Sequence, residues 1–257
     1  NATYLVVPQF AAGGVNYDTT AFQIERHGGS AASEIVAATA RFARTPYTGH
    51  NVRQVRFDGL MRAKERRLAP AARAAAAARA GISAQIRKST LPTSRTFWVF
   101  ADTLATTYKQ ITASLVYNGT SVAIYQDNAS PPGFTAQQLT QFGTLDDAVL
   151  YQIVVNTFAQ PTDIDNNQHV IMLLTPAVNA LTPAADCTTE GFVAGYFDPN
   201  DLTPTAANSN AGEIFYAIVP DPNGTAHSCA HSVSDVFSII PGTFMHELQH
   251  MISYGQH

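Results

Sequence analysis

The distribution of apolar residues after position 93 predicts a series of β-strands. Three stretches are rich in β-branched and aromatic residues and read as strands: TFWVFAD, ITASLVY and TSVAIYQ. The last two flank Asn118-Gly119, a dipeptide that supplies the positive φ angles of a type I′ hairpin turn. The continuous apolar run HVIMLL predicts a strand buried on both faces, and EIFYAIV predicts a further strand that ends at Pro220.

Two other segments repeat apolar residues at helical spacing. The first begins near Thr135, which forms a capping-box pattern with Gln138, and continues to about residue 158. The second covers roughly residues 234 to 254 and contains Pro241, which marks either its start or a kink. The order strand, hairpin, helix, strand, strand, helix predicts an α+β fold in which helices cover a mixed sheet.

The same patterns divide the chain into three parts. Residues 1–60 contain short β-like runs separated by Gly-rich turns, which predict a small β-rich amino-terminal region. Residues 61–92 are basic and Ala-rich, and predict a helix or a linker. Residues 93–257 contain the strands and helices described above and are expected to form one α+β unit.

Charge is unevenly distributed along the chain. All 15 Lys and Arg residues precede Gln110, whereas 13 of the 19 acidic residues follow it. The bases between residues 62 and 88 could follow nucleic-acid phosphates, but that stretch lacks interleaved aromatic residues, so a solvated helix or linker is the simpler interpretation. We expect no nucleic-acid partner.

The termini and the apolar content bear on the cellular location. The chain has no apolar run of about 20 residues and does not open with a basic and then apolar signal segment, so we expect a mature soluble protein that does not enter a membrane. Its two cysteines, Cys187 and Cys229, suit one disulfide in an oxidising compartment. That bond would close a loop of 42 residues and stabilise the fold by about 4 kcal/mol. Two buried free thiols are the alternative.

His246, Glu247 and His250 carry the chemistry, because they form the motif His-Glu-x-x-His. Side chains four residues apart on an α-helix project from one face, separated by about 6 Å of rise, so both imidazoles can bind one ion. They would provide two ligands of a tetrahedral Zn²⁺ site and leave room for a third ligand and a water. Glu247 would be the general base that takes a proton from this water. The motif therefore predicts a zinc-dependent endopeptidase.

Other interpretations of this motif remain open. A surface helix with two unliganded histidines would need no metal, and a closed structural zinc site would need no carboxylate between its ligands. A catalytically silent, zincin-like binding module is the alternative from a different functional class. The chain has no G-x-S-x-G elbow, Walker loop or dinucleotide-binding glycine pattern, so serine hydrolases and nucleotide-dependent enzymes are not indicated.

The segment TFMHELQHMISYGQH resembles the active-site helix of the hyicolysin family of secreted bacterial zinc metallopeptidases. The stretch PTDIDNNQHVIMLLTPAVNAL is similar to the strand-containing segment that precedes this helix, and GYFDPNDL followed by SNAGEIFY is similar to the segment just before it. The resemblance covers about residues 93–257. It implies a zincin-like mixed sheet with a backing helix and an active-site helix, secretion from the cell, and protein or peptide substrates.

The resemblance also implies roles for residues around the motif. In zincins the strand before the active-site helix is an edge strand that pairs with the substrate backbone, which implies substrate binding by Glu213, Ile214, Phe215 and Tyr216. An ordinary edge strand protected by loops is the alternative. The family's third zinc ligand is a Glu on a second helix, tens of residues beyond the motif. We therefore expect a carboxy-terminal continuation or a second chain to supply it.

Three further metal assignments are weaker. His257 lies about 16 Å beyond His246 along a continuous helix, which is too far for it to bind the same ion. The alternating oxygen donors of residues 163 to 167 resemble a calcium loop, but Leu174 stands where an EF-hand needs a bidentate Glu, so a polar turn is the simpler interpretation. A pair of loop histidines would suggest a second metal site, although nothing in their spacing requires one. The residues of these last two sets are Asp163, Asp165 and Asn167, and His227 and His231.

Overall fold

The computed structural model describes residues 51–80, 90–226 and 228–256. Most of the β-rich region expected at residues 1–60 therefore lies outside the described residues. Helix α1 (Val52–Ala80) runs through the expected boundary at residue 60, so residues 52–60 are helical. The basic, Ala-rich segment expected at residues 61–92 is helical as far as Ala80.

The rest of the described chain is built around a six-stranded mixed sheet with the order β1-β2-β3-β4-β6-β5. Strands β1, β2 and β3 pair antiparallel, β3, β4 and β6 run parallel, and β5 pairs antiparallel with β6 at one edge. The expected α+β fold is confirmed. The strands are β1 (Ser94–Phe100), β2 (Tyr108–Asn118), β3 (Val122–Asp127), β4 (Val170–Leu174), β5 (Gly195–Phe197) and β6 (Ile214–Ala217).

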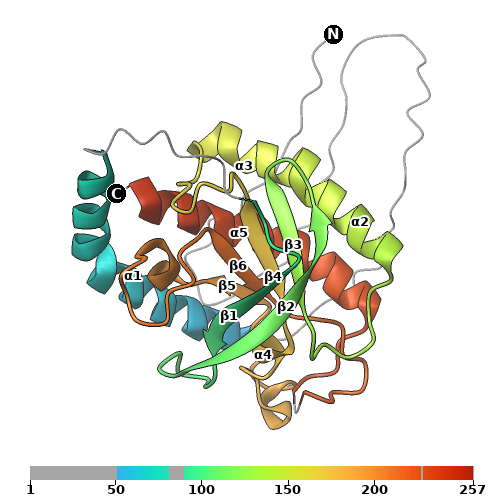
Figure 1. Cartoon of the computed structure of the whole chain (residues 1–257). Coiled ribbons are helices and arrows are strands. Elements are labelled where there is room, and N and C mark those ends of the chain that lie inside the picture. The colour runs from blue at the N-terminus through green and yellow to red at the C-terminus, as the bar shows by residue number, and fades with distance from the viewer. Residues whose placement is uncertain (1–50, 81–89, 227, 257) are drawn as a thin grey trace, which may run out of the picture. The chain divides into compact units, whose positions relative to one another are not determined.

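Helices cover one side of this sheet. Figure 1 shows α2, α3 and α5 behind the sheet in this view, and α3 packs against α5. The backing helix begins at a capping box of Thr135 and Gln138, as predicted. Pro241 lies inside α5 and so does not mark its start. The elements are α2 (Ala136–Leu145), the π-helical turn η1 (Asp146–Leu150), α3 (Tyr151–Phe158), α4 (Pro176–Asn179), the 3-10 turns η2 (Ala184–Asp186) and η3 (Pro199–Leu202), and α5 (Val233–Gln256).

Apolar packing between the sheet and α5 fixes the position of that helix. Every residue of β4 is buried, as the continuous apolar run predicted. Phe244 of α5 is fully buried, and its ring lies 5.8 Å from that of Phe215 on β6. Leu248 and Met251 are also fully buried on the same helix. Because these side chains face the sheet, the opposite side of α5 is left to present polar residues.

The hairpin between β2 and β3 is present, but its turn is not of type I′. Neither Asn118 nor Gly119 has a positive φ angle, and three residues separate the two strands. The turn is held instead by Asp147 of the backing helix, whose carboxylate accepts the amide N–H groups of residues 120–122 at 2.7 to 2.9 Å. A Cβ at Gly119 would lie 2.6 Å from Asp147 Oδ2, so glycine allows the close approach of this carboxylate.

A disulfide joins Cys187 and Cys229, as predicted, with their Cα atoms 5.5 Å apart. The bond links the loop before β5 to the segment that leads into α5. Such a bond persists in oxidising compartments. Within residues 51–80, 90–226 and 228–256, no helix has the length and apolar character needed to cross a bilayer.

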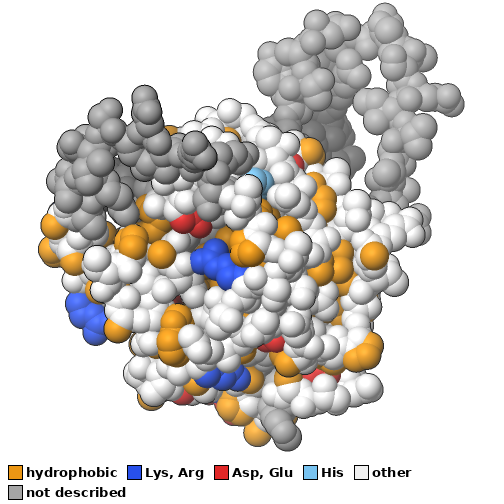
Figure 2. All heavy atoms as spheres, in the orientation of Figure 1, with side chains coloured by type: hydrophobic (Ala, Val, Ile, Leu, Met, Phe, Trp, Pro, Cys, Tyr) orange, Lys and Arg blue, Asp and Glu red, His pale blue; other side chains and the backbone are white. Residues whose placement is uncertain are grey.

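The basic residues of α1 account for part of the uneven charge. Arg53 pairs with Asp186, Arg56 Nη1 lies 3.1 Å from Glu190 Oε2, and Lys64 Nζ lies 2.7 Å from Asp198 Oδ1. On the face shown in Figure 2, Lys and Arg side chains are scattered and do not form one continuous patch. Basic residues of α1 therefore pair with acidic residues that lie more than 120 residues later in the chain.

Candidate active site

His246 and His250 project from the same face of α5, and their Nε2 atoms are 3.2 Å apart. Two nitrogen ligands at 2.0 to 2.1 Å from one tetrahedral ion would be separated by about 3.3 Å. The side chain of His246 is 52% exposed, so the pair is open to solvent. The two rings are thus already spaced to share one metal ion.

The protein favours the neutral form of both imidazoles. Burial lowers the pKa of His246 and outweighs the opposing effect of Asp58. Burial, followed by the charges of Arg62 and His246, lowers the pKa of His250 to about 3. Since a metal binds the neutral imidazole, both residues are in the ligand form at neutral pH.

Glu247 points away from solvent beside this pair. Glu247 is 1% exposed, and its Oε2 accepts a hydrogen bond from the Phe197 N–H at 3.0 Å. Its Oε1 lies 3.8 Å from His246 Nε2 and has no hydrogen-bond partner among the residues that the structure describes. A buried oxygen without a partner costs free energy, so this atom suits a water or ion bound at the histidines.

The environment of Glu247 brings its pKa close to neutrality. Burial is the largest cause and the nearby Asp58 adds to it, while Arg62 and the Phe197 N–H oppose the shift, so that the pKa rises to about 8. A carboxyl group with a pKa near the working pH can both accept and return a proton. A cation bound at the adjacent histidines would lower this pKa and favour the carboxylate form that a general base needs.

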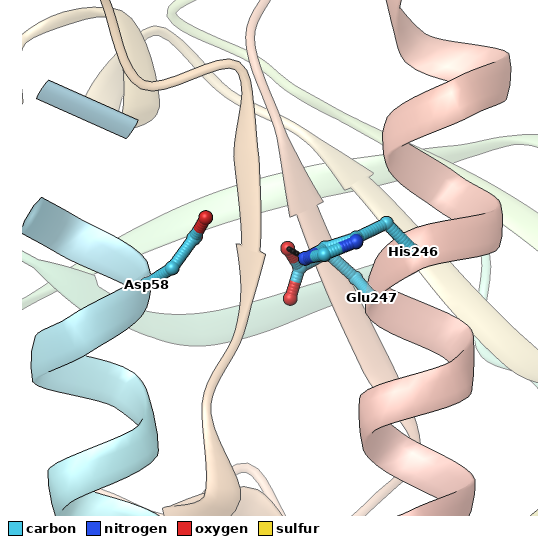
Figure 3. Close-up of side chains that lie close together, drawn as sticks. All are labelled: Asp58, His246 and Glu247. Carbon is cyan, nitrogen blue, oxygen red and sulfur yellow. Dashed lines mark ion pairs between the residues drawn. The ribbon is translucent and has the colours of Figure 1, made fainter. Parts of the chain in front are cut away.

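Two residues of α1 also reach this site. Figure 3 shows Asp58 on α1 across from His246 and Glu247 on α5, and one ligand atom from each of the three lies within 4.8 Å of the others. Arg62 Nη2 lies 3.9 Å from Glu247 Oε2. The sequence had no signal for either residue, because each is a single charged position in a segment of no recognised motif.

A cavity of about 380 Å³ opens beside the motif. Its walls come from α1, from the residues before β5 and from α5. Asn51 and Gln54 line it on the α1 side, and Gly242 and Thr243 line it next to His246 on α5. This volume is large enough for a side chain of a bound peptide or for a small ligand.

The expectation that residues 213 to 218 form an edge strand is wrong. Strand β6 pairs with β4 on one side and β5 on the other, so its backbone has no free edge for a substrate. The strand at this edge of the sheet is β5, which has only three residues. The residues expected to bind substrate are all at most 1% exposed, which leaves them out of reach of a substrate: Glu213, Ile214, Phe215 and Tyr216.

The other metal assignments change in detail. Asp163 and Asp165 do approach each other, but their third neighbour is the buried Glu213, while Asn167 donates to Asp165. Acidic groups commonly gather without an ion, so calcium stays a prediction. His231 packs against Phe192 with ring centroids 4.3 Å apart. The remaining two histidines considered as ligands, His227 and His257, lie outside the described residues.

No model of a known protein family matches the chain, and no curated protein matches it in sequence. The resemblance to hyicolysins therefore stays a prediction.

Proposed function

We propose that this chain is a secreted, zinc-dependent endopeptidase with a zincin-like architecture. The observation that carries the proposal is the pairing of two converging imidazoles, with nitrogens 3.2 Å apart, and a buried carboxylate oxygen that lacks a hydrogen-bond partner within the described residues. A surface helix with unliganded histidines gives no reason for this arrangement. A closed structural zinc site gives no reason for Glu247.

The residues present fit a zinc ion. His246 and His250 would hold it through their Nε2 atoms, which are the kind of donor that zinc prefers. Bound Zn²⁺ acts as a Lewis acid, which acidifies water and polarises a carbonyl group. Because burial keeps both imidazoles neutral, no proton has to be displaced from them at neutral pH.

Glu247 would perform the proton transfers of peptide hydrolysis. In the first step it accepts a proton from the attacking water as the water oxygen bonds to the scissile carbonyl carbon. In the second step it returns that proton to the amide nitrogen as the carbon–nitrogen bond breaks, which releases an amine and a carboxylic acid.

The edge strand β5 is where we place the substrate backbone. It pairs with β6 on one side only, and Phe197 at its end donates its N–H to Glu247. An extended peptide that adds to the free side of β5 would bring its carbonyl groups close to the motif. The neighbouring cavity of about 380 Å³ would accept a substrate side chain.

Replacing Glu247 by glutamine is the direct test. The variant should retain stoichiometric zinc by elemental analysis and lose casein hydrolysis by about 10²-fold or more, since general base catalysis contributes 10²- to 10⁴-fold. His246→Ala should lose the zinc. Gln249→Ala, which changes a variable position of the motif, serves as the matched control and should keep both properties.

The same measurements separate the peptidase from the silent binding module. A module of that kind would hold zinc at a stoichiometry near one and hydrolyse nothing. Wild-type protein that binds no zinc would refute both proposals.

A further inference from the structure

Helix α1 lies beside β5, on the side that does not pair with β6, and binds the first carbonyl of that strand and backbone groups just before it. The side-chain amide of Gln54 donates to the Gly195 carbonyl at 3.0 Å and accepts the Ala194 N–H at 2.7 Å. Asn51, the residue just before α1, accepts through its Oδ1 the N–H of Phe192, which precedes β5, at 3.1 Å. A carboxamide side chain has an N–H donor and a C=O acceptor, like a peptide group. The Gln54 side chain therefore binds backbone groups with which a bound peptide would form hydrogen bonds.

One turn further along, α1 reaches the chemical groups of the site. The Gln54 amide also donates to Asp58 Oδ1 at 2.7 Å, which fixes the carboxylate on the side of α1 that faces α5. The Asp58 carboxylate and the ligand atoms of His246 and Glu247 lie within 4.8 Å of one another. Carboxylate oxygen is an established zinc ligand, so Asp58 could bind an ion held by His246.

Apolar anchors and ion pairs hold α1 in this position. Phe57 and Met61 are 2% and 1% exposed, and the Phe57 ring lies 5.3 Å from that of Tyr196 on β5. Lys64 pairs with Asp198, just after β5, while Arg53 pairs with Asp186. The helix therefore docks through burial and complementary charge on both sides of the site.

We propose that α1 is an internal inhibitor of this peptidase, in which Gln54 occupies the substrate edge of β5 and Asp58 binds the zinc ion in the position that water takes in the active form. Displacement of α1 frees the edge for an extended peptide and frees one metal position for water. This inference rests on the proposed function. It leaves the third ligand of the active form to a continuation or a second chain, as the resemblance to hyicolysins implies.

The test uses the full chain with substitutions in α1. Asp58→Asn should weaken zinc binding by at least about tenfold in chelator competition, because loss of even an outer-shell partner of a metal ligand typically costs 10- to 100-fold. Gln54→Ala should raise hydrolysis of a quenched extended peptide by about tenfold, because it removes two hydrogen bonds that keep α1 docked. It should also speed hydrogen exchange at the Ala194 amide. Arg67→Ala, on an exposed position of α1, is the matched control.

The outcomes separate this inference from the function on which it rests. If the wild-type chain and Arg67→Ala bind zinc, but Asp58→Asn binds it equally well, Asp58 is not a ligand and the inference is overturned. Gln54→Ala with unchanged hydrolysis and unchanged exchange at Ala194 would overturn the inhibitory role. In both cases the peptidase proposal stands. Circular dichroism melting curves that match the wild type show that the variants remain folded.

Discussion

Replacing Asp146 by asparagine is expected to stabilise the protein at neutral and alkaline pH. Asp146 begins the π-helical turn of the backing helix and is 0% exposed. Neither of its carboxylate oxygens has a hydrogen-bond partner in the described part of the chain. Burial raises its pKa from 3.8 to about 8, since the charged form cannot be hydrated there.

The size of the effect follows from this shift in pKa. A folded-state pKa above the unfolded value means that the folded protein binds the proton more tightly, so the stabilising contribution is complete below pH 3.8 and lost as the pH rises through about 8. Each pH unit within that window costs about 1.4 kcal/mol, which amounts to roughly 4 kcal/mol at pH 7. Asparagine does not ionise and so avoids this cost.

Urea unfolding at pH 5 and pH 8 measures the effect. The stability of Asp146→Asn relative to the wild type should increase by roughly 3 to 4 kcal/mol between these two pH values. Glu213 and Glu247 also have raised pKa values, of about 7 and about 8, but they are common to both proteins and cancel in the comparison. A difference that is the same at both pH values would refute the reasoning.

The adjacent Asp147 provides the matched control. Its carboxylate accepts three backbone N–H groups of the turn between β2 and β3. Asp147→Asn leaves an amide nitrogen facing these donors, so it should destabilise the protein by about 1 to 3 kcal/mol. The two neighbouring substitutions should therefore change stability in opposite directions at pH 8.

Three further predictions concern single features of the fold. Serine at both Cys187 and Cys229 should lower the free energy of unfolding by about 4 kcal/mol, because the disulfide closes a loop of 42 residues; an unchanged urea midpoint would count against this. Gly119→Ala should lower the free energy of unfolding, measured by thermal denaturation, by about 1 to 3 kcal/mol, since its Cβ would lie 2.6 Å from Asp147 Oδ2. A variant as stable as the wild type would show that the turn can shift to accommodate the methyl group. Gly242→Leu meets no atom within 4 Å of its new Cβ, so it should narrow the cavity without loss of stability and shift cleavage towards small side chains. Equal loss of activity on all peptide substrates would contradict that role.

Signals that lie within one element were enough to predict much of the fold. The strand at residues 170–174 is a continuous apolar run, and the helix start at Thr135 carries both partners of its capping box. Neither feature needs a contact from elsewhere in the chain. The strand β5 was missed because three residues are too few to show a period, and its pairing depends on β6. The edge position of β6 was expected from the resemblance to zincins, and the pairing of β5 with β6 contradicts it.

The turn at Asn118-Gly119 shows a different limit of local reasoning. The dipeptide suits a type I′ turn, but a carboxylate from the backing helix binds the turn amides and selects another conformation. The role of glycine is to leave room for Asp147. A tertiary contact therefore overrides the preference of the isolated dipeptide.

The candidate site was predictable to the extent that it lies on one helix. The spacing of His246 and His250 is enough to bring their nitrogens together. Asp58 and Arg62 could not be predicted, because they come from a helix almost two hundred residues earlier, and only docking of that helix brings them to Glu247. The uneven distribution of charge was the one hint that the two parts of the chain interact.

The ion pairs of α1 have a consequence for the electrostatic field around the molecule. Only 4 of the 15 bases, but 14 of the 19 acids, follow residue 80. Displacement of α1 would leave Asp186, Glu190 and Asp198 without their cations, and the remaining surface would become strongly anionic. Such a field concentrates cationic molecules and repels anionic ones over a Debye length of about 8 Å at physiological ionic strength. The same movement that uncovers β5 would thus favour the diffusional capture of lysine- and arginine-rich polypeptides, an advantage that high salt should abolish.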